Sequence, residues 1–225
     1  MTINFDPLDN PIYSALTSVH KPLSQSSGCA IRYIREVSTM AAFSDIHSFS
    51  HLHNLVVPQE PIALLRAKPL VISDDWHIIK DLTIEQMVCT DLKPLLMHPI
   101  VSLQQEDVPD MVALASVTEP GPFSSGTIRT GRYFGIKSSE GKLLAMAGER
   151  LKMDGFTEIS AVCTDPDFRG RGYAGSLISF LAMLIFQEGK IPFLEVKTTN
   201  EAKKLYKKLG FTTRAEIQFT MIELL

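Results

Sequence analysis

The sequence predicts an α/β protein with a mixed, partly antiparallel sheet flanked by helices, preceded by an N-terminal mixed α/β region. Two observations lead to this class. The 225 residues are 45% apolar, enough for one large core or two small ones at roughly 150 residues per domain. From Pro99 onward, strand-like and helix-like runs follow in the order β α β β β α β α β.

The first 97 residues have the weakest periodicity. Serine-rich runs separate short strand-like pieces, which lie at 30–34, 61–67 and 76–89. We therefore expect residues 1–97 to form a mixed α/β region of unknown role, and residues 98–225 to form a separate domain.

The elements of the second region begin with a strand at 100–104, where apolar and polar residues alternate. A helix over 106–117 follows, with acidic residues and a proline in its opening turn. A loop rich in Pro, Gly and Ser occupies 119–126. Ser139-Glu140-Gly141 separates two strand-like runs and predicts a β-hairpin, after which 156–162 forms another strand.

The C-terminal elements have clear start and stop signals. Glycines follow both expected helices, and Thr198 with Glu201 has the spacing of a capping box that opens the second helix. The expected order is helix 172–187, strand 191–198, a helix ending at Leu209 and strand 211–224.

Composition excludes several classes of protein. With 22 basic and 25 acidic residues the net charge is −3, which disfavours nucleic acid or an anionic membrane as partner. The longest apolar stretch, 173–186, is shorter than the roughly 20 residues that span a bilayer. The three cysteines are scattered, as in a reducing compartment, and the start lacks the pattern of a signal peptide. We expect a cytoplasmic protein with free thiols.

The strongest chemical signal is a glycine-rich turn within 164–175, between a strand and a helix. Helix N-termini carry free N–H groups and positive potential, so such a junction binds anions. Gly170 and Gly172 leave room for phosphate oxygens, and Arg169 and Arg171 supply cationic donors. The turn therefore predicts a phosphate-binding site.

Three other interpretations of this turn have less support. The P-loop requires a GK[ST] sequence, and the chain has none. Gly170, Gly172 and Gly175 do match GxGxxG, with Glu195 placed as a ribose-binding acid, but too little chain follows for a dinucleotide fold. A turn that merely connects two elements would leave the two arginines without a role.

Arg169-Gly170-Arg171-Gly172-Tyr173-Ala174 fits the pattern R-x-x-G-x-A. With Leu205-Tyr206-Lys207-Lys208-Leu209-Gly210-Phe211, which fits LYxxxGF, it resembles the GNAT superfamily of acyl-CoA-dependent N-acyltransferases. The resemblance covers about 99–225. RGRGYA and the C-terminal position of the domain are also similar to the glycine N-acyltransferase-like branch.

The resemblance implies N-acetylation of an amine by acetyl-CoA through direct attack. It implies that the turn, including Tyr173 and Ala174, binds coenzyme A, and that the backbone of Val162, Cys163 and Thr164 pairs with the pantetheine arm. Cys163 is then no nucleophile.

The resemblance also implies a catalytic pair. Glu158 would remove the ammonium proton, and Tyr206 would protonate the departing thiolate. From the residues alone, Glu158 could equally be an exposed acid on a strand, and Tyr206 could be a core residue.

The chain departs from the superfamily at the residue seven before the tyrosine, where Thr199 replaces the usual asparagine and Asn200 follows. Either residue could contact the coenzyme or only cap the helix. His47, His51 and His53 lack the other ligands of a metal site, so we expect no metal.

The acceptor is expected to be an amine-bearing small molecule or peptide, which the sequence does not identify. The alternative to an enzyme is an acyl-CoA-binding sensor or interaction module without catalysis. Phe123 could line an acceptor pocket, although packing or exposure is the commoner fate of such a residue.

Overall fold

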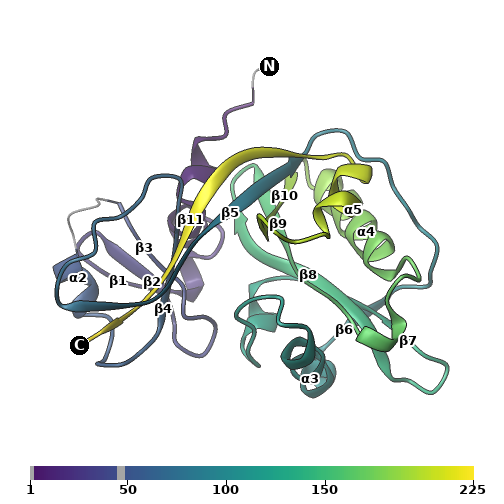
Figure 1. Cartoon of the computed structure of the whole chain (residues 1–225), viewed down its shortest axis with the longest axis horizontal. Coiled ribbons are helices and arrows are strands. Elements are labelled where there is room, and N and C mark those ends of the chain that lie inside the picture. Colours follow the sequence, from purple (N-terminus) through teal and green to yellow (C-terminus); the bar gives the residue numbers. More distant parts are fainter. Residues whose placement is uncertain (1–2, 45–48) are drawn as a thin grey trace.

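In the computed structural model, which describes residues 3–44 and 49–225, an eight-stranded sheet runs through most of the chain (Figure 1). Neighbouring strands are antiparallel except for β9 (Phe156–Thr164) and β10 (Ile191–Lys197), which are parallel. The strands are, in spatial order, β4 (Ile62–Arg66), β11 (Phe211–Leu224), β5 (Trp76–Cys89), β10 (Ile191–Lys197), β9 (Phe156–Thr164), β8 (Leu143–Met153), β7 (Tyr133–Lys137) and β6 (Val101–Leu103).

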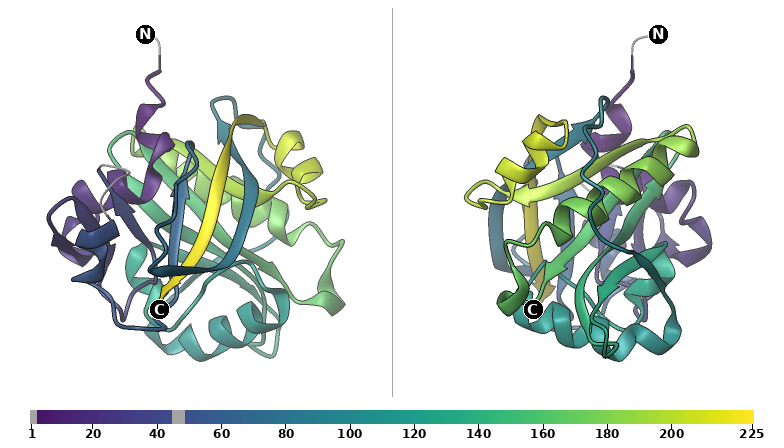
Figure 2. Two further views of the ribbon diagram at one scale, coloured as in Figure 1. Left: turned by 60° about the vertical axis from the view of Figure 1, so that its left-hand side comes forward. Right: turned by 90° about the vertical axis from the view of Figure 1, so that its right-hand side faces the viewer.

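The helices cover both faces of this sheet (Figure 2). Apolar residues of α4 (Tyr173–Gln187) and α5 (Lys203–Lys208) pack in a core with Ala145, Ala147 and Leu194. Residues of α3 (Val108–Thr118) pack instead with Met146, which points to the opposite face from its neighbours in β8. Short 3₁₀ helices lie at Asp6–Asp9, Lys21–Leu23, Gln105–Asp107, Thr127–Thr130 and Pro166–Phe168.

The N-terminal elements form a second, three-stranded sheet beside the first. It consists of β1 (Ser24–Ser27), β2 (Ala30–Tyr33) and β3 (Ala41–Phe43), accompanied by α1 (Pro11–Thr17) and α2 (Phe49–His53). Buried residues of this region share cores with β4 and β11. Figure 1 shows β5 and β11 running side by side along the border between the two groups of elements.

The predicted fold class is confirmed, and most predicted elements lie within two residues of their observed bounds. The predicted start of the helix, directly after Thr198, is wrong. Residues 198–202 form turns, in which Asn200 Oδ1 accepts from the Ala202 N–H at 2.9 Å, and α5 begins at Lys203. A local side-chain to backbone bond there replaces the predicted capping box.

The eight-stranded sheet includes strands from both sides of the proposed boundary between residues 97 and 98. β5 lies between β11 and β10, near the centre of the sheet, although it belongs to the first 97 residues. The division into 1–97 and 98–225 stays a prediction.

Candidate active site

The central feature of the site is the point where β9 and β10 stop pairing. The two strands pair only over Phe156–Glu158 and Ile191–Phe193. Beyond Phe193, β10 stays bonded to β5, and β9 stays bonded to β8 up to Thr164. Among the residues that the structure describes, the β9 edge that faces β10 therefore has no strand partner beyond Glu158, and it borders a cleft of about 1380 Å³.

A bulge interrupts the pairing of β9 with β8 just beyond Glu158. Ser160 pairs with Gly148 and Cys163 with Met146, so Ala161 and Val162 lie opposite the single residue between them. Ala161 has φ +50°, a conformation that costs a non-glycine residue about 1–3 kcal/mol. Bulges of this kind re-aim the backbone, and both residues of the bulge line the cleft.

The glycine-rich turn lies at one end of the cleft. Gly170 and Gly172 have φ of +76° and +84°, and Gly172 is the N-cap of α4. His98 Nε2 lies 2.7 Å from the Arg171 carbonyl oxygen, and this contact holds the segment that contains His98 against the turn. Across residues 3–44 and 49–225, neither Arg169 nor Arg171 has an acidic partner, so both guanidinium groups can meet an anion.

Gly172→Val should weaken coenzyme A binding more than Arg171→Ala. The valine is strained at φ +84° and its side chain lies where phosphate oxygens would approach, whereas the alanine loses a charge-assisted contact of about 1.5–3 kcal/mol. Calorimetric titration with coenzyme A measures both effects. Gly141→Val is the control, since Gly141 has φ +87° in a hairpin turn with open space around it. Equal and negligible effects of the first two changes would contradict a phosphate site.

Three charged side chains cluster where β8, β9 and β10 meet. Arg150 donates from Nε and Nη2 to the Glu158 carboxylate, at 2.8 and 2.5 Å. Arg150 Nη2 also lies 3.4 Å from Glu195 Oε2. The Glu158 side chain is 1% exposed, so the interpretation of Glu158 as an exposed strand acid is wrong. Arg150 and Glu195 line the cleft. Glu158 lies behind Arg150, to which it is bonded, and does not line the cleft itself.

The two carboxylates differ in their electrostatics. Burial raises the pKa of Glu195, and the nearby negative charge of Glu158 raises it further, while Arg150 opposes both effects. Glu158 holds the bidentate pair with Arg150, whereas the contact of Glu195 with the same guanidinium group is the longer one, at 3.4 Å. A carboxyl group with a raised pKa in a cleft is suited to acid–base chemistry.

Tyr206 lies on α5 and lines the same cleft. Its side chain is largely buried beside Phe211, and burial raises the pKa of its phenol to about 12. The phenol is therefore protonated throughout the physiological pH range and is available as a proton donor. Cys163 is 1% exposed, and burial raises the pKa of its thiol to about 11, so it is a poor nucleophile.

The structure brings most of the predicted coenzyme-binding residues to the cleft. These are Val162, Thr164, Arg169, Gly170, Arg171, Gly172, Tyr173, Ala174 and Asn200. The side chain of Cys163 is buried in the core beneath α3, and Thr199 does not line the cleft.

The sequence does not predict two features of the site. These are the role of Arg150, and a role for Glu195 other than that of a ribose ligand. A signal was present, because Glu158 and Glu195 each interrupt an apolar strand, and a charge in such a position needs a buried partner.

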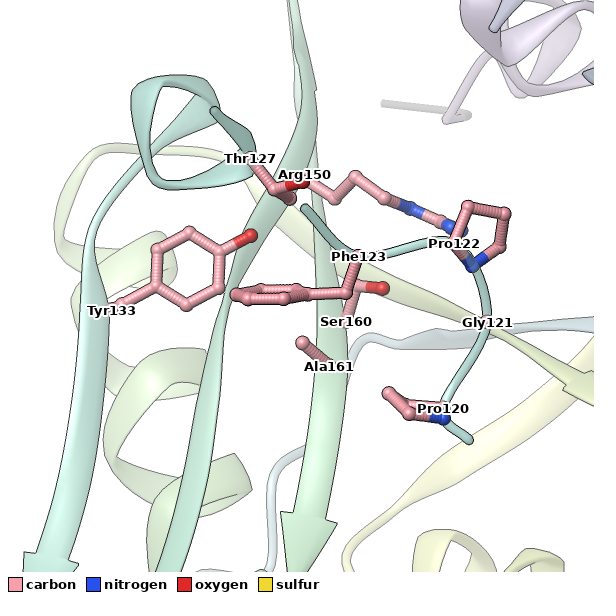
Figure 3. Close-up of a pocket in the computed structure, with 9 residues that line it drawn as sticks. All are labelled: Pro120, Gly121, Pro122, Phe123, Thr127, Tyr133, Arg150, Ser160 and Ala161. Carbon is pink, nitrogen blue, oxygen red and sulfur yellow. The ribbon is translucent and has the colours of Figure 1, made fainter. Parts of the chain in front are cut away.

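The loop 119–126 closes one side of the cleft. Its Pro120, Pro122 and Phe123 line the cleft, and the Phe123 ring packs edge-on against Tyr133, with ring centroids 5.8 Å apart. Figure 3 shows the loop beside Ser160 and Ala161, with the Arg150 side chain extending toward Pro122.

Two further observations concern other classes of site. In the described part of the chain, no group of three or more His, Cys, Asp or Glu side chains could hold a metal ion; His47 lies outside the described residues. Of the helices that the structure describes, none combines the length and apolar character needed to cross a bilayer.

Comparison with known proteins identifies the family. Residues 133–220 match the model of the FR47-like protein family. A solved structure from Novosphingobium aromaticivorans, of a protein assigned to the GNAT family of acetyltransferases, is 33% identical; the match covers 97% of this chain and 99% of that one, with a TM-score of 0.90. The chain belongs to the GNAT family.

More distant structures share the fold. A GCN5-related N-acetyltransferase from Kribbella flavida is 14% identical over 94% of this chain and 95% of its own, with a TM-score of 0.64. A GCN5-related N-acetyltransferase-like protein from Streptococcus suis is 13% identical over 95% and 93%, with a TM-score of 0.56. The search of curated proteins gives no match. Membership of the family supports an acyltransferase activity.

Proposed function

We propose that the protein is an N-acetyltransferase that moves the acetyl group of acetyl-CoA to an amine by direct attack. The observation that carries this proposal is that pairing between β9 and β10 ends beside a phosphate-binding turn, within one cleft. A strand edge without a partner can pair with an extended amide chain such as pantetheine. The turn is then placed for the pyrophosphate, and Arg169 and Arg171 for its charge.

The side chains around the bulge are suited to the reaction. The amine nitrogen attacks the thioester carbon, and its proton passes to Glu195, directly or through water. A backbone N–H near Ala161 and Val162 stabilises the oxyanion as the carbonyl oxygen gains charge. The carbon–sulfur bond then breaks, and the thiolate takes the phenolic proton of Tyr206, which solvent replaces.

Glu158 has a different part in this scheme from the one that the sequence predicted. Its carboxylate holds Arg150 and raises the pKa of Glu195. Glu158 itself as the base stays a prediction, and Glu158→Gln and Glu195→Gln together separate the two assignments.

The proposal includes two further expectations from the sequence, one about location and one about the acceptor. The three cysteines are free, which supports the expected cytoplasmic location. The resemblance to the glycine N-acyltransferase-like branch is a hypothesis about the acceptor.

The direct test of the proposed function measures coenzyme A release and acetylated product with a panel of primary amines. A protein that binds coenzyme A but acetylates no amine would instead be an acyl-CoA sensor.

Tyr206→Phe should lower kcat and alter the alkaline side of the pH profile. With the pKa of the phenol near 12, the wild-type rate should stay high beyond pH 10, where a free tyrosine ionises, and decline only above it. The phenylalanine keeps most of the packing with Phe211 but has no proton to give. The pH dependence of kcat/KM with one acceptor measures this. A variant with full rate and the same alkaline decline would show that Tyr206 is only a core residue.

A further inference from the structure

The cleft extends well beyond the region assigned to coenzyme A. Its volume of about 1380 Å³ exceeds the 300–1,000 Å³ usual for one small ligand. The turn at Gly170 and Gly172 occupies one end, and Glu195 lies between this turn and a wall formed by β4, β5 and β11. The part along this wall is available to the second substrate.

The wall is apolar. Leu65, Phe219 and Leu82 are register partners on three adjacent strands, and their side chains therefore share one face of the sheet. Met221 lies two residues along β11 on the same face. All four line the cleft, and Phe219, Leu82 and Met221 are only partly buried. An acceptor with an apolar body would cover them.

A cation lies at the end of this wall. Lys80 is the register partner of Met221, lines the cleft and is exposed. No ion pair joins Lys80 to an acidic side chain in the described ranges, and the neighbouring Asp81 accepts hydrogen bonds from Gln218 and Thr220 instead. From Glu195 to Lys80, the cleft thus presents in turn a carboxylate, an apolar wall and an ammonium group.

We infer that the acceptor is a primary amine joined through an apolar body to a carboxylate. This inference rests on the proposed function. The amine end lies at Glu195, which takes its proton during the attack, the apolar body lies on Leu82 and Phe219, and the carboxylate pairs with Lys80. Lys80 is then a specificity-determining residue that takes no part in the transfer itself.

A series of straight-chain ω-aminocarboxylates of increasing length, compared with alkylamines of the same length, tests the inference. The wild type should prefer the aminocarboxylate at one chain length, where the carboxylate reaches Lys80. Lys80→Gln should lower kcat/KM for that compound about tenfold or more, and leave kcat/KM for the alkylamine and KM for acetyl-CoA unchanged. Lys93→Gln is the control, since Lys93 is exposed and does not line the cleft.

Binding provides a readout that needs no turnover. An alkanoate of the preferred length should compete with the acceptor in the wild type, and about tenfold more weakly in Lys80→Gln. Acetylation of both series at equal efficiency, unchanged in Lys80→Gln, would overturn this acceptor class and leave the acetyltransferase intact. Acetylation of no member of either series, nor of any amine in the wider panel, would overturn the proposed function.

Discussion

Glu195→Gln should lower kcat by about 10² to 10⁴, the usual contribution of a positioned general base. The glutamine keeps the shape of the side chain and the contact with Gln86, but it cannot accept the proton that the attacking amine loses. In the wild type the acidic limb of the pH profile should reflect the ionisation of Glu195, at a pH well above that of a free glutamate because burial raises its pKa. The variant should lose that limb when the acceptor is held constant.

The same substitution should leave stability unchanged or raise it. The pKa of Glu195 is higher in the folded protein than in the unfolded chain, so its contribution to stability is fully present in acid and is lost as the pH rises through the folded pKa. Glutamine does not ionise, so above the folded pKa the variant should be more stable than the wild type. This difference in stability should disappear below the pKa of Glu195 in the unfolded chain. Chemical unfolding at two pH values measures this, with Glu201→Gln at the exposed rim of the cleft as control. A Glu195→Gln enzyme with wild-type kcat would remove Glu195 from the mechanism.

The C-terminal half of the fold was predictable because its signals are local. Alternation along 211–224, glycines after both helices and the turn at Ser139–Gly141 each depend on neighbours in the chain. The phosphate turn was predictable for the same reason, since its glycines and arginines lie within a few residues of a helix start.

The electrostatics of the site depend on contacts that are distant in sequence. Arg150 and Glu195 are 45 residues apart, and their meeting depends on the parallel pairing of β9 with β10. Lys80 reaches the cleft only because β5 lies beside β11 in the sheet, although the two are far apart in the chain. Sequence periodicity shows which face a residue occupies, but not which strand lies next to it.

Glu158→Ala should destabilise the protein by about 3–5 kcal/mol, the usual cost of removing one partner from a buried ion pair. The Arg150 side chain is only 14% exposed, and without Glu158 its remaining acidic contact is the longer one to Glu195. Urea unfolding measures the loss. Arg150→Met combined with Glu158→Leu should recover much of it at a pH where Glu195 is protonated, because the pair is then replaced by apolar side chains and Glu195, which loses its contact with Arg150, carries no charge. A double variant that loses as much stability as the two single variants together would contradict this account of the pair.

Glu158→Gln separates the two possible bases. If Glu195 is the base, this variant loses the negative charge that helps to raise the pKa of Glu195, so the acidic limb should move to lower pH while most of kcat remains. If Glu158 is the base, kcat should fall by about 10² to 10⁴ and Glu195→Gln should be the milder change. The pH dependence of kcat for the two variants with the same acceptor therefore assigns the proton to one carboxylate, because the two assignments predict opposite orders of activity.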